Sequence, residues 1–323
     1  MKFTFRGVRG SIASPGPATV RYGGNTTCIE IRGDNGEIII LDAGTGIFPL
    51  AQSLLKELPV NCHVFISHTH WDHIQGLPFF TPLFIPGNEV TIYGAGDPIS
   101  QRGIKHVLDR QLEYAYFPIR EAELSAEINY VNLADRESVQ IGSVLVENIL
   151  MNHPAMDYGY KVSCGDQSLF FTGDHEWQSN IYEPGSEGHD EFEEEIESRR
   201  AEIVDFIRGV DALIIDSSYT RAEYPAKVGW GHGTFDTSIA VAREAQVSHC
   251  FFTHHEPTRS DEELEQAYHQ ALADNADGRT STEPVFYLAR EGIPFEIGSE
   301  NALEAFTPAV PGRPAASLGL KSH

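Results

Sequence analysis

The stretch FISHTHWDHIQG (65–76) puts three histidines, one tryptophan and one aspartate within six positions, directly after an apolar run. Side chains of an extended chain alternate between two faces, so His68 and His70 point the same way. A tight turn into a helix then brings Asp72 and His73 inward from the other side. Neutral imidazoles and a carboxylate are typical ligands of zinc and other borderline divalent metals. A solvated strand end would account for one such histidine, whereas three with an aspartate indicate a metal site.

Isolated histidines and one aspartate follow three later apolar runs. His153 comes after the run in ILMNHP, and Asp174 comes after the run in LFFTGD. Either His254 or His255 follows the run in HCFFTHH, because an extended backbone directs only one of two neighbours inward. Ligands collect at such strand ends in open α/β sheets. The joint pattern, more than any single position, predicts one shared metal site.

The order of these residues resembles the metallo-β-lactamase superfamily: HxHxDH, then an isolated His, then the Asp of TGD, then a His in FTHH. The segments GGNTTCIEI and IIILDAGTG also match the opening strands of that fold. The resemblance runs from about Phe5 to about Ile297. It implies an α/β fold, a four-layer αβ/βα sandwich, with a binuclear metal centre in the cleft between two sheets.

The resemblance also divides the candidate ligands between two divalent metal ions. It assigns His68, His70 and His153 to the first ion, Asp72, His73 and the late histidine to the second, and Asp174 to both. The FTH alignment favours His254 as the late histidine, with His255 as the alternative. Asp42, which follows the apolar run 38–41, is a candidate acceptor for the other N–H of a ligand histidine. Zn²⁺ is the expected ion, and Mn²⁺ or Fe²⁺ can occupy similar sites.

The later part of the sequence points to one branch of the superfamily. The zinc β-lactamases use a cysteine in the second metal site, and none of the four cysteines here fits that position. All four lie in or beside apolar segments, so we expect them to be reduced and buried. The segment DALIIDSSYTRAEYPAKVGWGHGT resembles the phosphodiesterase branch, which includes ribonuclease Z and small cyclic phosphodiesterases. In that branch a histidine before a late helix serves the leaving group, and His232 has this position. The helix starting near Thr234 also presents amides that favour an anionic phosphate.

The chemistry of this branch follows from charge. A phosphodiester is an anion that resists attack by another anion, and two metal ions neutralise its oxygens and lower the pKa of a bound water towards about 7. We expect the resulting metal-bound hydroxide to attack in line with the leaving oxygen. Asp72 would orient the water or accept its proton, and a protonated His232 would act as general acid. Arg6 and Arg9 are further candidates for contacts with the phosphate.

The charge balance bears on the size of the substrate. The chain has 23 Lys and Arg against 47 Asp and Glu, a formal net charge of −24. RNA would be repelled over most of such a surface. Ribonuclease Z grips transfer RNA with a basic arm, and this chain has no insertion rich in Lys and Arg. We therefore expect a small, cyclic phosphodiester, either a cyclic nucleotide or a ribose cyclic phosphate, and no large nucleic acid. Tyr114, Tyr116 and Phe117 are candidates for stacking on a base, and Trp71 is expected to pack rather than react.

Two further hypotheses stay open at this point. A thioesterase or lactonase-type hydrolase can share the same ligand pattern, and so can a ribonuclease Z-like RNA endonuclease. A protein that binds metal without catalysis is less favoured, because every formal ligand is present.

The organisation of the chain is simple. Interleaved strands and helices without a linker predict one hydrolase domain over residues 1–300, and the Pro-, Ala-, Gly- and Ser-rich segment 301–323 predicts a disordered tail. The carboxylate-rich helix near 190–208 is expected to be solvated. We expect a cytoplasmic protein without membrane contact, because no signal peptide or membrane span is evident. The resemblance suggests a homodimer.

Overall fold

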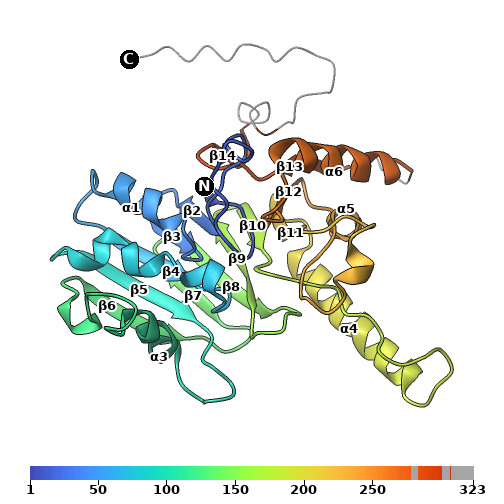
Figure 1. The fold of residues 1–323 in the computed structure, drawn as a ribbon, viewed down its shortest axis with the longest axis horizontal. Coiled ribbons are helices and arrows are strands. Elements are labelled where there is room, and N and C mark those ends of the chain that lie inside the picture. Colours follow the sequence, from blue (N-terminus) through green and yellow to red (C-terminus); the bar gives the residue numbers. More distant parts are fainter. Residues whose placement is uncertain (278–282, 300–305, 307–323) are drawn as a thin grey trace, which may run out of the picture.

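A computed structural model describes residues 1–277, 283–299 and 306, and Figure 1 shows the arrangement of its elements. Fourteen strands form two seven-stranded sheets within these residues. The first sheet has the order β14-β1-β2-β3-β4-β5-β6, and the second has the order β13-β12-β11-β10-β9-β8-β7. Helices cover the outer face of each sheet, so the layers run helix, sheet, sheet, helix.

The strands of the first sheet are β1 (Lys2–Gly7), β2 (Cys28–Arg32), β3 (Ile38–Leu41), β4 (Asn61–Phe65), β5 (Glu89–Gly94), β6 (Glu127–Asn132) and β14 (Pro294–Glu296). Those of the second are β7 (Ser138–Ile141), β8 (Val144–Leu150), β9 (Tyr158–Cys164), β10 (Gln167–Phe171), β11 (Ala212–Asp216), β12 (His249–Thr253) and β13 (Val285–Leu288). The helices are α1 (Ile47–Leu54), α2 (Trp71–Ile74), α3 (Ile104–Asp109), α4 (His189–Ile207), α5 (Phe235–Glu244) and α6 (Asp261–Asp274). Short 3₁₀ helices lie at Leu77–Phe79, Thr81–Phe84, Arg110–Leu112, Glu121–Glu123 and Tyr224–Ala226.

Each sheet combines an antiparallel part with a parallel part. β1, β2 and β3 pair antiparallel, and β3 to β6 pair parallel. In the second sheet, β7 to β10 pair antiparallel and β10 to β13 pair parallel. The parallel strands deliver the loops after their carboxyl ends to one edge of each sheet, which is where ligand sites form in α/β folds.

Alternating side chains separate three apolar cores. In β3, Ile39 and Leu41 join the core between the sheets, while Ile38 and Ile40 join a second core with α1 and α3. In β12, Phe251 faces the space between the sheets, where it contacts Phe3, Phe5, Tyr287 and Phe295. Its neighbours Cys250 and Phe252 face a third core with α4, α5 and α6. Successive side chains of a strand point to opposite faces of the sheet, so a strand buried on both faces contributes to two cores. The predicted four-layer αβ/βα sandwich is therefore confirmed.

Several details differ from the sequence predictions. Trp71, expected to pack, is 66% exposed at the start of α2. The predicted tail, residues 301–323, lies outside the described residues except for Phe306, which is buried against Phe5 and Phe251. The four cysteines are free and buried, as expected. Among the described helices, none combines the length and the apolar composition needed to cross a bilayer.

Candidate metal centre

Loops from both sheets bring the predicted ligands together at one edge of the sandwich. The loop after β4 carries His68 and His70, and α2 carries Asp72 and His73. The other side chains come from loops of the second sheet: His153 after β8, Asp174 after β10 and His254 after β12. The structure thus brings seven residues from four separate segments to one place. Such convergence of titratable side chains is typical of a functional site.

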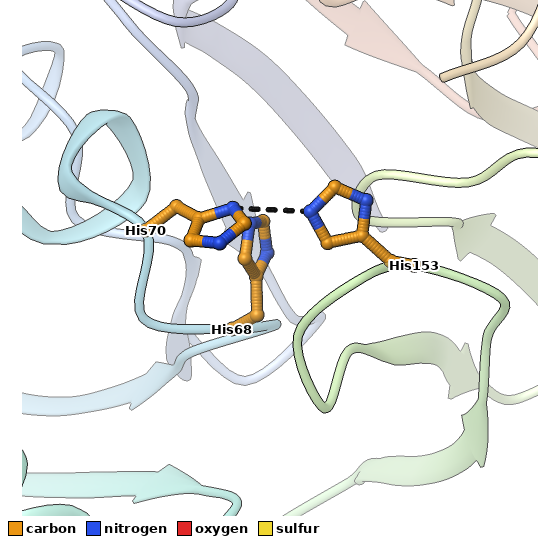
Figure 2. Close-up of side chains that lie close together, drawn as sticks. All are labelled: His68, His70 and His153. Carbon is orange, nitrogen blue, oxygen red and sulfur yellow. Dashed lines mark hydrogen bonds between the residues drawn. The ribbon is translucent and has the colours of Figure 1, made fainter. Parts of the chain in front are cut away.

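The first cluster consists of His68, His70 and His153, and Figure 2 shows how the three rings face one another. His70 Nδ1 lies 3.0 Å from His153 Nε2, and the ring centroid of His68 lies 4.6 Å from each of the other two. His153 Nδ1 donates a hydrogen bond to the carbonyl oxygen of Gly231 at 2.9 Å, which leaves the Nε2 lone pair directed at the cluster. His70 is exposed, so this cluster opens to solvent on that side.

The second cluster consists of Asp72, His73, Asp174 and His254, all of them buried. His254 Nε2 lies 3.3 Å from Asp72 Oδ2, and His73 Nε2 lies 3.4 Å from the same oxygen. The backbone N–H of Ser11 donates to Asp72 Oδ2 at 2.7 Å, which fixes the orientation of that carboxylate. Four donor atoms therefore surround a volume small enough for a single cation.

Asp174 faces both clusters, with one oxygen toward each. Its Oδ2 lies 3.6 Å from His68 Nε2 and 4.0 Å from His153 Nε2. Its Oδ1 lies 3.2 Å from both His73 Nε2 and His254 Nε2. A carboxylate in this position is able to contact two ions at once.

The polar atoms at the centre of this arrangement lack hydrogen-bond partners among the described residues. They are His68 Nε2, His73 Nε2 and Asp174 Oδ1. An unsatisfied buried polar atom costs about 1–3 kcal/mol, so a fold retains several together only where something else binds them. Imidazole nitrogens and a carboxylate oxygen are the donor set that a divalent ion such as zinc requires. The residues present therefore fit divalent metal ions.

The outer nitrogens of the ligand rings are held by further buried groups. His73 Nδ1 donates to Asp42 Oδ2 at 2.7 Å, which is the contact proposed for Asp42 from the sequence. His68 Nδ1 lies 3.2 Å from the carboxylate of Asp157, which is fully buried. Burial lowers the pKa of His68 well below its usual range, and the neutral imidazole that results is the form that binds a metal. Contacts of this kind fix the tautomer and orientation of ligand rings.

His232 lies at the side of the centre. Its Nδ1 donates to Asp216 Oδ2 at 2.8 Å and lies 3.8 Å from Asp174 Oδ2, and its ring stacks on His254 with centroids 4.6 Å apart. Burial lowers the pKa of His232, but the charge and hydrogen bond of Asp216 outweigh burial and raise it overall. Donor atoms of Asp174, Asp216, His232 and His254 also lie within 4.8 Å of one another. His232 is therefore close enough either to act on a substrate or to bind an ion.

Local backbone geometry decides between the two late histidines. His254 adopts a left-handed φ of 56°, which turns its ring into the second cluster at the end of β12. His255 points away, and its Nε2 donates to the carbonyl oxygen of Ala289 at 2.9 Å. A Cβ atom on Gly10 would lie 2.2 Å from the His254 ring, so only glycine fits there. The structure thus brings His254, and not His255, into the centre.

The sequence predictions that Arg6 and Arg9 contact the phosphate are wrong. The Arg9 guanidinium is fully buried and donates to the carbonyl oxygens of Gly23 and Arg259. Arg6 pairs with the carboxylate of Glu30. Both cations are therefore committed to contacts within the fold and not to a phosphate.

Sequence reasoning also missed two acids beside the centre. Asp216 lies at the end of the apolar strand β11, and the same kind of position at a strand end identified the proposed ligands. The carboxylate of Asp157 meets His68 only through tertiary packing, so no local pattern points to it. A third acid, Glu176, accepts from the backbone N–H groups of Gly229 and Gly231 and so braces the loop that leads to His232.

Comparisons with known proteins agree with this geometry. Residues 38–255, more than half of the chain, match the family described as "Beta-lactamase superfamily domain". Ribonuclease Z from Staphylococcus aureus is 24% identical over 310 residues, covering 86% of this chain and 95% of that protein.

Two solved structures share the fold. The metallo-β-lactamase fold protein YhfI from Bacillus subtilis superposes with a TM-score of 0.62 at 17% identity, covering 91% of this chain and 99% of that one. The short form of human tRNase Z superposes with a TM-score of 0.57 at 18% identity, covering 92% and 99%. The chain belongs to the metallo-β-lactamase superfamily, in which it is similar to the ribonuclease Z-like phosphodiesterases, and it is a metal-dependent hydrolase.

Proposed function

We propose that this protein is a binuclear metal-dependent phosphodiesterase that hydrolyses a small, cyclic phosphodiester. The observation that carries the proposal is the position of Asp174, with one carboxylate oxygen 3.6 Å from His68 and the other 3.2 Å from His73. Two cation sites that share a carboxylate are suited to a substrate whose oxygens bear negative charge.

The proposed ligands form two sets joined by Asp174. They are His68, His70 and His153 for one ion, Asp72, His73 and His254 for the other, and Asp174 for both. When bound, the two divalent ions would neutralise the phosphodiester oxygens and activate a water molecule for attack. Zn²⁺ suits this set of imidazoles and carboxylates, and Mn²⁺ or Fe²⁺ are the alternatives.

Two side chains of this centre have proposed roles in moving protons. His232, held by Asp216 and with its pKa raised by that carboxylate, donates a proton to the leaving oxygen of the ester. Asp72, fixed by the Ser11 N–H, orients the attacking water or accepts its proton. Asp42 keeps the Nε2 lone pair of His73 directed at the centre by accepting from Nδ1.

The preference for a small substrate rests on charge. The formal net charge of −24 opposes binding of a large polyanion. The segment between the ligands His153 and Asp174 is only the hairpin of β9 and β10, and it contains a single lysine and no arginine. The names of the similar ribonuclease Z and tRNase Z indicate RNA substrates for those proteins, so an RNA endonuclease is the alternative function. A cytoplasmic location and a homodimer stay predictions from the sequence.

Replacing Asp174 tests the bridging role. Asp174→Ala removes the oxygens that face both clusters, so metal content should fall from about two ions per chain to less than one. Plasma mass spectrometry on dialysed protein measures this content. The matched control is Asp190→Ala on the surface of α4, where the carboxylate is exposed and metal content should not change. Two ions retained at full occupancy in Asp174→Ala would refute the bridging assignment.

Replacing His232 separates catalysis from metal binding. His232→Ala should retain its metal and lose roughly 10²- to 10⁴-fold in kcat, because the leaving oxygen has no proton donor. Metal content and turnover of adenosine 3′,5′-cyclic phosphate, whose alkoxide leaving group needs a proton, are measured on the same sample. His189→Ala at the start of α4 is the control and should keep full activity. A His232→Ala variant with normal turnover rules out the acid role, and one that loses metal makes His232 a ligand instead.

A substrate panel tests the reaction class. The metal-loaded enzyme should hydrolyse bis(p-nitrophenyl) phosphate and cyclic nucleotides, and leave a thioester, a lactone and precursor transfer RNA at background. Strong thioester or lactone cleavage with background phosphodiester turnover would replace the proposal with an esterase. Efficient processing of precursor transfer RNA would contradict the small substrate.

A further inference from the structure

A cavity of about 350 Å³ lies beside the first cluster. Three loops and one helix form its walls: residues 66–69 after β4, residues 95–99 after β5, residues 154–156 after β8, and Val107 of α3. His68 itself lines the cavity, and Pro154 directly follows His153. Its volume is in the range of pockets that bind small molecules, which is about 300–1,000 Å³. A substrate group bound there would therefore be attached close to the reacting phosphate.

The lining of this cavity is mostly apolar. Its apolar residues are Ile66, Ala95, Pro98, Ile99, Val107, Pro154, Ala155 and Met156. Ile99 is 94% exposed at the rim, where its side chain is available for contact with a ligand. Met156 has a flexible thioether, which adapts to flat groups of different shape. The surface therefore suits a ring that loses contact with water when it binds.

The charges around the cavity exclude a second anionic group. Neither lysine nor arginine is present among the described residues that line it. The one carboxylate, Asp97, accepts from the backbone N–H groups of Ile99 and Ser100 and remains an anion at the rim. A further phosphate in this cavity would meet one negative charge and no cation among the described lining residues, so its binding there is disfavoured.

Two other places in the fold are less suitable for binding the ring of a substrate. Tyr114 and Tyr116 are exposed, Phe117 packs on Phe79, and none of the three aromatic residues of the 114–117 segment lines the cavity. A larger hollow of about 610 Å³ is lined by Arg6 and Arg32 and includes none of the proposed ligands.

We propose that this cavity binds the neutral ring of the substrate, a nucleobase, and so selects cyclic nucleotides over ribose cyclic phosphates that carry a second phosphate. The inference rests on the proposed phosphodiesterase function and adds the class of substrate. The ring would contact Ile99, Val107 and Met156, while the cyclic phosphate reaches the centre past His68 and His153.

The test compares substrates that differ only in the ring. The probes are adenosine 3′,5′-cyclic phosphate and the methyl riboside 3,5-cyclic phosphate, which has no base, with Zn²⁺-loaded enzyme. We expect kcat/KM to favour the nucleotide by roughly ten- to a hundredfold, the effect of removing part of one ring from water in an apolar cavity. Ala155→Trp should fill the cavity and bring the ratio of the two kcat/KM values close to one. Ile99→Ser, at an exposed position where folding is not at risk, should lower the same ratio.

The matched control is Ala273→Trp on the exposed face of α6, which should leave the ratio unchanged. A wild-type ratio near one, or a ratio unaffected by Ala155→Trp, would overturn the proposal.

A binding measurement separates this proposal from the proposed function. If the enzyme hydrolyses neither cyclic phosphate nor bis(p-nitrophenyl) phosphate, the phosphodiesterase function fails. The cavity is then judged by calorimetric binding of adenosine 3′,5′-cyclic phosphate. The proposal requires a Kd at least about tenfold weaker in Ala155→Trp than in Ala273→Trp. Equal Kd values would exclude the cavity as the base site.

Discussion

The carboxylate of Asp174 is the contact on which the rest of the site depends. It lies between two groups of histidines, 3.6 Å from His68 and 3.2 Å from His73. His68 and His73 belong to the first sheet and Asp174 to the second, so the carboxylate also joins the two halves of the sandwich. Without bound cations, this edge would hold several buried donors and acceptors that have no partners. Asp174 therefore contributes both to the contact between the two sheets and to the proposed metal centre.

The negative charge of the chain bears on which substrates can reach the centre. The chain carries a formal charge of −24, and the acidic helix α4 extends away from the sheets in Figure 1. An anionic substrate of the kind proposed would therefore have to be attracted by the metal-loaded centre itself, because the surface as a whole repels it. Asp42, Asp157 and Asp216 lie behind the histidines and keep the rings oriented. An acidic surface around a centre that would hold two cations favours a small anionic substrate over a large one.

Local sequence patterns predicted much of the fold and most of the centre. The HxHxDH stretch holds four of the proposed ligands in one turn, and His153 and Asp174 each follow an apolar strand, so the joint pattern of these positions singles them out. The continuous apolar run around Phe251 in β12 likewise predicts a strand buried on both faces. These features depend only on residues that are neighbours in the sequence, so local sequence patterns are enough to predict them.

Features that depend on tertiary contacts could not be predicted in this way. Asp157 meets His68 only after the two sheets pack, and Arg9 becomes buried only because the 256–261 segment surrounds it. The left-handed φ of 56° at His254 turns its ring, and not that of His255, into the centre, and no local sequence pattern specifies this conformation. The cavity beside His68 is formed by three loops that are distant from one another in the sequence, so no local pattern predicts it.

The most direct test of the account is a crystal structure of the metal-loaded protein with anomalous scattering measured at the absorption edge of the metal. The account predicts two anomalous peaks, about 3.5–4 Å apart, one on each side of the Asp174 carboxylate. A single peak confined to one cluster, or peaks away from Asp174, would contradict the shared binuclear centre.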